Sequence, residues 1–115
     1  MKKILAVLLL TIASLAGHAQ SGQRIYTALM PIQGSTYSQL IPSASIYACV
    51  YNSSLSCVTP INIYSDKALQ HLITQPLIAD PKTAVYQYYI QSGTILVEKV
   101  CAPYNQCNSN AVFIT

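Results

Sequence analysis

Residues 85–100 have the sequence Val-Tyr-Gln-Tyr-Tyr-Ile-Gln-Ser-Gly-Thr-Ile-Leu-Val-Glu-Lys-Val, and this stretch is the clearest indicator of the fold. Its first six residues favour a β-strand, and strand geometry places Tyr86, Tyr88 and Ile90 on one face. A Gln-Ser-Gly turn signal follows, and the last residues form a second β-favouring run. The stretch therefore predicts two strands joined by a tight hairpin that contains Gly93.

Shorter β-favouring runs lie on both sides of this stretch. They occupy residues 25–30, 44–51, 61–64, 74–79 and 111–114. The helix candidate at residues 67–73, with Asp66 as its cap, is too short to be stable alone, so we expect a single turn or a loop. Seven short strands, regular turn signals and no long helix predict an all-β domain, either a sandwich or a barrel.

The first nineteen residues have the pattern of a secretory signal peptide. Two lysines follow Met1, residues 4–16 form an apolar run, and Gly17 and Ala19 are small residues at the −3 and −1 positions of a cleavage site. A membrane-spanning helix needs about 20 apolar residues, so this run is short for an anchor. We expect cleavage after Ala19, no membrane span afterwards, and export to the periplasm or the extracellular space; the alternative is an uncleaved N-terminal anchor.

The remaining chain is expected to hold residues 20–43 as an N-terminal strand and polar linker, and residues 44–115 as the sandwich domain. Residues 20–115 carry four basic and three acidic side chains, which leaves a net charge of +1. A nucleic-acid surface needs several clustered cations, so this charge argues against a nucleic-acid partner.

Four cysteines, Cys49, Cys57, Cys101 and Cys107, predict two disulfides in an exported chain of this size. The local pairing of Cys49 with Cys57 and Cys101 with Cys107 is favoured, because both gaps contain turn-forming residues. A crossed pairing, such as Cys49 with Cys101, is the alternative. A zinc site is disfavoured, because there is no Cys-x-x-Cys pair and His71 is the one histidine after the leader.

Few side chains suited to catalysis follow the leader. Ser65, Asp66 and His71 supply the three residue types of a Ser–His–Asp triad, but nothing in the sequence marks this serine as a nucleophile. Glycoside hydrolysis would need two of Asp66, Asp80 and Glu98 to converge across a cleft, and their turn and edge positions argue against it. A calcium site at Asp66 and Asp80 is disfavoured, because calcium takes about six or more oxygen ligands and the chain has few carboxylates. We expect no enzyme activity, no catalytic residues, no metal and no cofactor.

The nine tyrosines are the more informative set, since the chain has one phenylalanine and no tryptophan. Tyrosine offers a large rigid contact area with a polar rim. Most are expected to fill the core or to stiffen the sheets. An exposed subset with Gln and Asn neighbours is the candidate binding surface, and it comprises Tyr47, Tyr51, Tyr88 and Tyr89.

Three motifs resemble those of one family of domains. They are Ile-Asn-Ile-Tyr-Ser-Asp at residues 61–66, Gln-Pro-Leu-Ile-Ala-Asp at 75–80, and Tyr-Gln-Tyr-Tyr-Ile-Gln-Ser-Gly-Thr at 86–94. The stretch that contains them resembles the prealbumin-like (transthyretin-like) β-sandwich domains of exported bacterial and phage tail-associated proteins, which are similar to the regulatory sandwich of carboxypeptidases. The resemblance implies a seven-stranded antiparallel β-sandwich with structural motifs and no catalysis.

Two functions are consistent with these observations. The first is a noncatalytic module with a structural or protein-interaction role at the cell envelope or on a surface or virion assembly, where a partner could add a strand to an exposed edge. The alternative is a small periplasmic inhibitor or carbohydrate-binding protein that uses a Tyr-, Asn- and Gln-rich surface or a loop.

Overall fold

The computed structural model describes residues 20–115, so the predicted signal peptide at residues 1–19 lies outside the described part of the chain. Residues 20–115 are all-β, without a helix. The eight strands are β1 (Ser21–Thr27), β2 (Leu29–Pro31), β3 (Ser38–Leu40), β4 (Ser45–Val50), β5 (Leu77–Ile78), β6 (Val85–Gln91), β7 (Ile95–Cys101) and β8 (Cys107–Phe113). The prediction of seven strands was therefore wrong by one.

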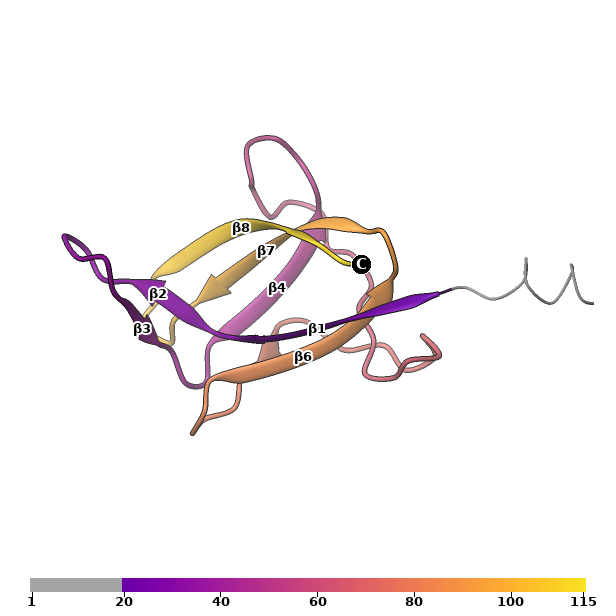
Figure 1. Cartoon of the computed structure of the whole chain (residues 1–115), viewed down its shortest axis with the longest axis horizontal. Helices are drawn as coiled ribbons and strands as arrows, with labels where there is room; N and C mark the ends of the chain where they lie inside the picture. The colour runs from indigo at the N-terminus through magenta and orange to yellow at the C-terminus, as the bar shows by residue number, and fades with distance from the viewer. Residues whose placement is uncertain (1–19) are drawn as a thin grey trace, which may run out of the picture.

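The strands form two layers that resemble a β-sandwich (Figure 1). One layer is a four-stranded antiparallel sheet in the order β5-β4-β7-β8, and the other contains the antiparallel pair β1-β6. An isolated bridge between Tyr64 and Tyr89 extends the second layer beyond β6. The small β2-β3 hairpin lies at one end of the molecule, and buried side chains of both layers form one hydrophobic core.

The predicted hairpin between β6 and β7 does not form. β6 pairs with β1, whereas β7 pairs with β4 and β8, so the turn at Gly93 carries the chain from one layer to the other (Figure 1). Gly93 has a φ of 81°, and the carbonyl of Gln91 accepts the Thr94 hydroxyl at 2.6 Å. Tight hairpins and turns between layers both use a glycine at positive φ, so the local sequence does not distinguish them. The inner residues of β6 and β7 consequently face each other across the core.

The predicted strand at residues 25–30 is divided between β1 and β2. The buried Ala28 lies where the two ladders meet. Its N–H donates to the carbonyl of Ala84, next in the β1-β6 register, and its carbonyl accepts the N–H of Ile41, next in the β2-β3 register. Residues 20–43 thus contribute three strands to the structure, whereas the sequence pattern indicated one strand and a linker. β1 pairs with β6 over all seven of its residues, which makes it part of the same two-layer domain.

Two other predicted strands differ in extent. Residues 61–64 make no named strand, although Tyr64 bridges to Tyr89 and the N–H of Ile61 donates to the carbonyl of Ala48 at 3.0 Å. β8 begins at Cys107, before the predicted start at 111, because pairing with β7 extends through the polar Asn-Ser-Asn run up to the turn. Hydrophobic periodicity alone therefore underestimates this strand.

The glutamine at position 75 joins two segments that the sequence analysis did not connect. Its side-chain oxygen accepts the N–H of Ala48 at 2.9 Å, and its amide nitrogen donates to the carbonyl of Ile61 at 2.7 Å. The side chain thus fills the space along β4 between its partner β5 and the stretch around Ile61. It satisfies backbone groups that would otherwise need a longer edge strand.

Both disulfides have the favoured local pairing. Cys49 is bonded to Cys57 and Cys101 to Cys107, and no free cysteine is present among residues 20–115. Cys101 and Cys107 are directly opposed in the β7-β8 register, so this bond links the two strands of the hairpin beside its turn. The Cys49–Cys57 bond closes the projecting loop that follows β4.

The turn after β5 depends on Asp80, whose carboxylate accepts the backbone N–H groups of Lys82 and Thr83, each at 2.8 Å. These hydrogen bonds lower the pKa of Asp80 below its ordinary value of 3.8, because they stabilise the charged form. A lowered folded-state pKa gives stability that is present above the unfolded pKa and lost as the pH falls through the folded value.

We expect the stability difference between the natural protein and Asp80→Asn to shrink as the pH falls below about 3.8. The asparagine keeps an acceptor oxygen but lacks the charge, so it should be less stable at pH 7 and nearly equal to the natural protein in strong acid. Urea unfolding midpoints at several pH values measure this difference. A difference that stays constant from neutral to strongly acidic pH would contradict this role for Asp80.

Candidate functional site

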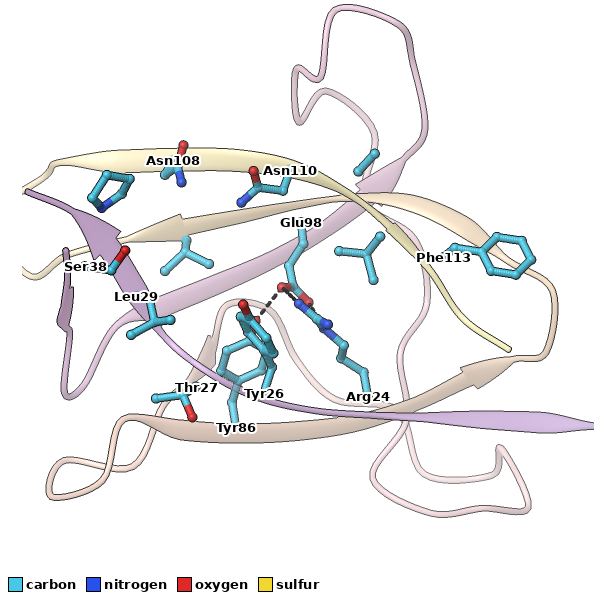
Figure 2. A pocket seen from close by; sticks show the side chains of 14 residues that line it. Arg24, Tyr26, Thr27, Leu29, Ser38, Tyr86, Glu98, Asn108, Asn110 and Phe113 are labelled. Atoms are coloured by element: carbon cyan, nitrogen blue, oxygen red, sulfur yellow. Dashed lines mark hydrogen bonds and ion pairs between the residues drawn. The ribbon is translucent and has the colours of Figure 1, made fainter. Parts of the chain in front are cut away.

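A buried carboxylate lies between the two layers. Glu98 projects from the inner face of β7, and the side chain is only 3% exposed. Its carboxylate accepts hydrogen bonds from Arg24 of β1, at 3.0 Å from one guanidinium nitrogen and 3.3 Å from Nε. It also accepts hydrogen bonds from two hydroxyls of β6, that of Tyr88 at 2.6 Å and that of Tyr86. The contacts with Arg24 and Tyr86 are drawn in Figure 2. We call these four residues the Glu98 cluster.

The electrostatics of this cluster keep Arg24, Tyr86 and Tyr88 protonated. Burial, followed by the negative charge of Glu98 and the hydrogen bonds to it, raises the pKa values of Tyr86 and Tyr88. For Arg24, burial alone would lower the pKa, but hydrogen bonding and attraction to Glu98 outweigh burial and raise it. The two hydroxyls therefore remain donors and the guanidinium remains charged, which compensates the buried carboxylate.

A cleft of about 460 Å³ opens beside this cluster, between β1 and β8 (Figure 2). Gly22 of β1 packs closely against the residues that follow β8: a Cβ there would overlap Ile114 and lie 2.7 Å from the carbonyl oxygen of Thr115. Residues of β2 and β3 line one end of the cleft. The cleft is lined by Arg24, Tyr26, Thr27, Leu29, Pro31, Ser38, Tyr86, Glu98, Val100, Asn108, Asn110, Ala111, Val112 and Phe113.

The lining of the cleft is polar and nearly neutral. The charges of Arg24 and Glu98 compensate each other, and the amides of Asn108 and Asn110 lie on the β8 side (Figure 2). The guanidinium of Arg24 covers the ring of Tyr26 at 4.1 Å. That cation–π contact covers one face of the tyrosine, so the groups beside Glu98 offer mainly hydrogen bonds.

The four tyrosines predicted as a binding surface do not form one patch. Tyr88 is fully buried and donates to Glu98, so it lies in the core and not on a surface. Tyr47 is half-buried in β4 beneath the ammonium of Lys99, 4.7 Å from the ring centroid, and Tyr51 is exposed just after β4. Tyr89 belongs to β6, in the other layer, and pairs with Tyr64.

The Ser65, Asp66 and His71 set forms a capped turn. The Asp66 carboxylate accepts the backbone N–H groups of Gln70 and His71, the shortest at 2.7 Å. These bonds lower the pKa of Asp66, against the opposing effect of burial. The Ser65 hydroxyl donates to the backbone carbonyl of His71, not to the imidazole, so the geometry of a nucleophile beside a base is not present.

The three carboxylates of residues 20–115 lie in separate environments. Asp66 and Asp80 each cap a turn, whereas Glu98 is bound by Arg24 and two tyrosines. Within residues 20–115 no three His, Cys, Asp or Glu side chains come close enough to hold a metal ion.

Sequence analysis did not identify Arg24, Asn108 and Asn110 as site residues. Glu98 carried a usable signal, since an acidic residue that alternates with Leu96 and Val100 on one strand face predicts a buried carboxylate with a partner. Its partner Arg24 is 74 residues away in the sequence, and no local pattern indicates which cation that partner is. The two asparagines resembled loop residues because they follow a turn.

Comparisons with protein-family models, with curated proteins and with solved structures found no match to this chain. In the part of the chain from residue 20 onward, no helix has the length and apolar character needed to cross a membrane. The cleft and the edge of β8 that borders it are therefore the basis for a functional proposal.

Proposed function

We propose that this protein is a noncatalytic, exported β-sandwich module of the prealbumin-like type that binds an extended segment of a partner protein along β8. It would act at the cell envelope or on a surface or virion assembly. Two disulfides are compatible with an oxidising compartment, which supports a periplasmic or extracellular location. The open edge of β8 is the single observation that carries the proposal.

β8 is an edge strand without the usual protection against pairing. Natural edges are shortened, charged, bulged or interrupted by proline, because an open edge is a template for another strand. β5, the opposite edge of the same sheet, has two residues, and β1 contains the inward-pointing charge of Arg24. β8 has seven residues, from Cys107 to Phe113, with neither a charge nor a proline. It is thus the edge best suited to strand addition.

The register indicates which backbone groups of β8 are open. The N–H of Ala102 donates to the carbonyl of Gln106 at 2.7 Å, so this pair at the turn is hydrogen-bonded. Bonded pairs alternate in an antiparallel ladder, which makes Asn108 and Asn110 the residues bonded to β7. Ala111 consequently directs its N–H and carbonyl away from β7, toward the open edge.

An extended segment fits this edge better than a second folded copy does. A copy that paired through its own β8 would bring its β7 and β4 with it. β1 and the β2-β3 hairpin lie across the cleft from β8, so they would obstruct the approach of the whole sheet of a second copy. One extended chain adds only about 4.8 Å to the sheet beyond β8.

The substitution Ala111→Pro tests this proposal, with Ala111→Val as the matched control. Proline removes the N–H directed toward the edge and leaves the bonds to β7 in place, whereas valine keeps the N–H. We expect Ala111→Pro to reduce capture of a discrete partner from the native envelope fraction at least about fivefold, from the lost backbone hydrogen bond and the proline ring. Ala111→Val should capture it as the natural protein does.

Equal capture by the proline and valine variants, or capture of no discrete partner, would overturn the proposal. Urea unfolding of both variants verifies that each one folds. A glycan array run beside the capture tests the alternative of a carbohydrate-binding protein. Strong glycan binding that is lost in Tyr51→Ala or Tyr89→Ala would favour that alternative.

A further inference from the structure

The side chains on the cleft side of β8 restrict what an added strand can carry. Asn108 is half-buried and Asn110 is exposed, and both belong to the lining of the cleft (Figure 2). Residues two apart on a strand lie on the same face, about 7 Å from each other. The hydrogen bonds of the Glu98 cluster come from Arg24 and two tyrosines and do not use either amide.

A strand added to β8 would place its own side chains directly opposite these amides. Opposed residues of an antiparallel pair have Cβ atoms about 5 Å apart, so cross-strand partners contact one another. The partner's residues opposite Asn108 and Asn110 would therefore point into the cleft.

The cleft disfavours three classes of side chain at those positions. A carboxylate of the partner would lie near the buried carboxylate of Glu98 and be repelled by it. The guanidinium of Arg24 is already paired with Glu98, so it does not compensate a second negative charge. An ammonium would find the carboxylate of Glu98 shielded, because it already accepts four hydrogen bonds. An apolar side chain would displace the water that hydrates the amides of Asn108 and Asn110, and it would offer no hydrogen bonds in place of those to water.

We propose that Asn108 and Asn110 recognise neutral amide side chains, Asn or Gln, at alternate positions of the protein segment that adds to β8. An amide donates and accepts at once, so it can pair with each asparagine in either orientation. This inference rests on the proposed function and states the chemistry of the partner. A saccharide is the less favoured occupant, because the ring of Tyr26 is covered by Arg24 and the cleft borders an open row of backbone groups.

Synthetic peptides test the inference. The probes are capped peptides of seven residues, matching β8, in which threonine alternates with glutamine, glutamate, lysine or leucine. Binding to protein produced from the full chain is measured by calorimetry. We expect the glutamine peptide to bind at least about tenfold more tightly than the other three.

Two variants show whether the amides of β8 are responsible. Asn108→Ala combined with Asn110→Ala should abolish the preference for glutamine. Gln87→Ala, which removes an exposed amide from the outer face of β6, should keep it. Loss of preference in both variants would contradict recognition in the cleft.

The outcomes separate this inference from the proposed function. If all four peptides bind equally and Ala111→Pro weakens all of them, strand addition is supported and amide recognition is overturned. If no peptide binds, amide recognition is overturned, and capture from the envelope fraction decides strand addition independently. Binding of a glycan in the cleft, together with no binding of any peptide, would overturn the inference as well.

Discussion

Replacement of Glu98 by glutamine is expected to lower the free energy of unfolding by about 3–5 kcal/mol, the usual cost of removing one partner from a buried ion pair. The substitution leaves the guanidinium of Arg24 partly buried without its counter-charge. It also replaces one acceptor oxygen by an amide donor that faces the hydroxyls of Tyr86 and Tyr88. Urea unfolding, followed by tyrosine fluorescence or circular dichroism, measures the change.

Lys99→Gln is the matched control, because it removes one charge from the next residue of the same strand. Lys99 lies on the other face of β7, over the ring of Tyr47, and its loss should cost less than about 1 kcal/mol. Arg24→Gln completes a double-mutant cycle with Glu98→Gln. We expect a coupling energy of about 1–3 kcal/mol, since the two side chains share hydrogen bonds. Additive losses would show that Glu98 and Arg24 do not stabilise each other.

Removal of the disulfides is the other change expected to have a large effect. Loop-closure entropy assigns each bond about 2–3 kcal/mol, because each closes a short loop. A domain of this size has a total stability of about 5–15 kcal/mol, so reduction of both bonds removes a large share of it. Urea unfolding with and without reductant measures the combined effect.

Paired alanine substitutions separate the two bonds. Cys101→Ala with Cys107→Ala removes the link across the β7-β8 hairpin, and Cys49→Ala with Cys57→Ala removes the link that closes the loop after β4. The second pair should cost more, because the buried Cys49 also fills core volume. A reduced protein that unfolds at the same urea concentration as the oxidised one would contradict this assignment of stability.

The features predicted correctly from the sequence are local ones. The strand character of residues 85–90, the short-range pairing of Cys49 with Cys57, and the capping of a turn by Asp66 depend on residues within a few positions of each other. Side-chain alternation and turn chemistry act over the same range, so they are visible in the linear chain.

The pairing of strands cannot be predicted from residues that are close in the sequence. Residues 91–93 favour a turn, but the same turn chemistry serves a hairpin within one sheet and a connection between two layers. The burial of Tyr86 and Tyr88 against Glu98 favours the connection between two layers, because facing layers let both hydroxyls reach the carboxylate. β1 supplies the compensating Arg24 from a segment that the sequence analysis treated as peripheral.

Period-two patterns predicted an all-β domain, and the turn-forming residues between the cysteines favoured two local disulfides over a crossed pairing, since both kinds of signal express interactions between near neighbours. The choice of β1 as the partner of β6, the enclosure of Glu98 and the cleft beside Asn108 and Asn110 come from contacts between distant segments. These arrangements depend on how two layers pack, and packing is a property of the whole domain because every buried polar group must find its partner there.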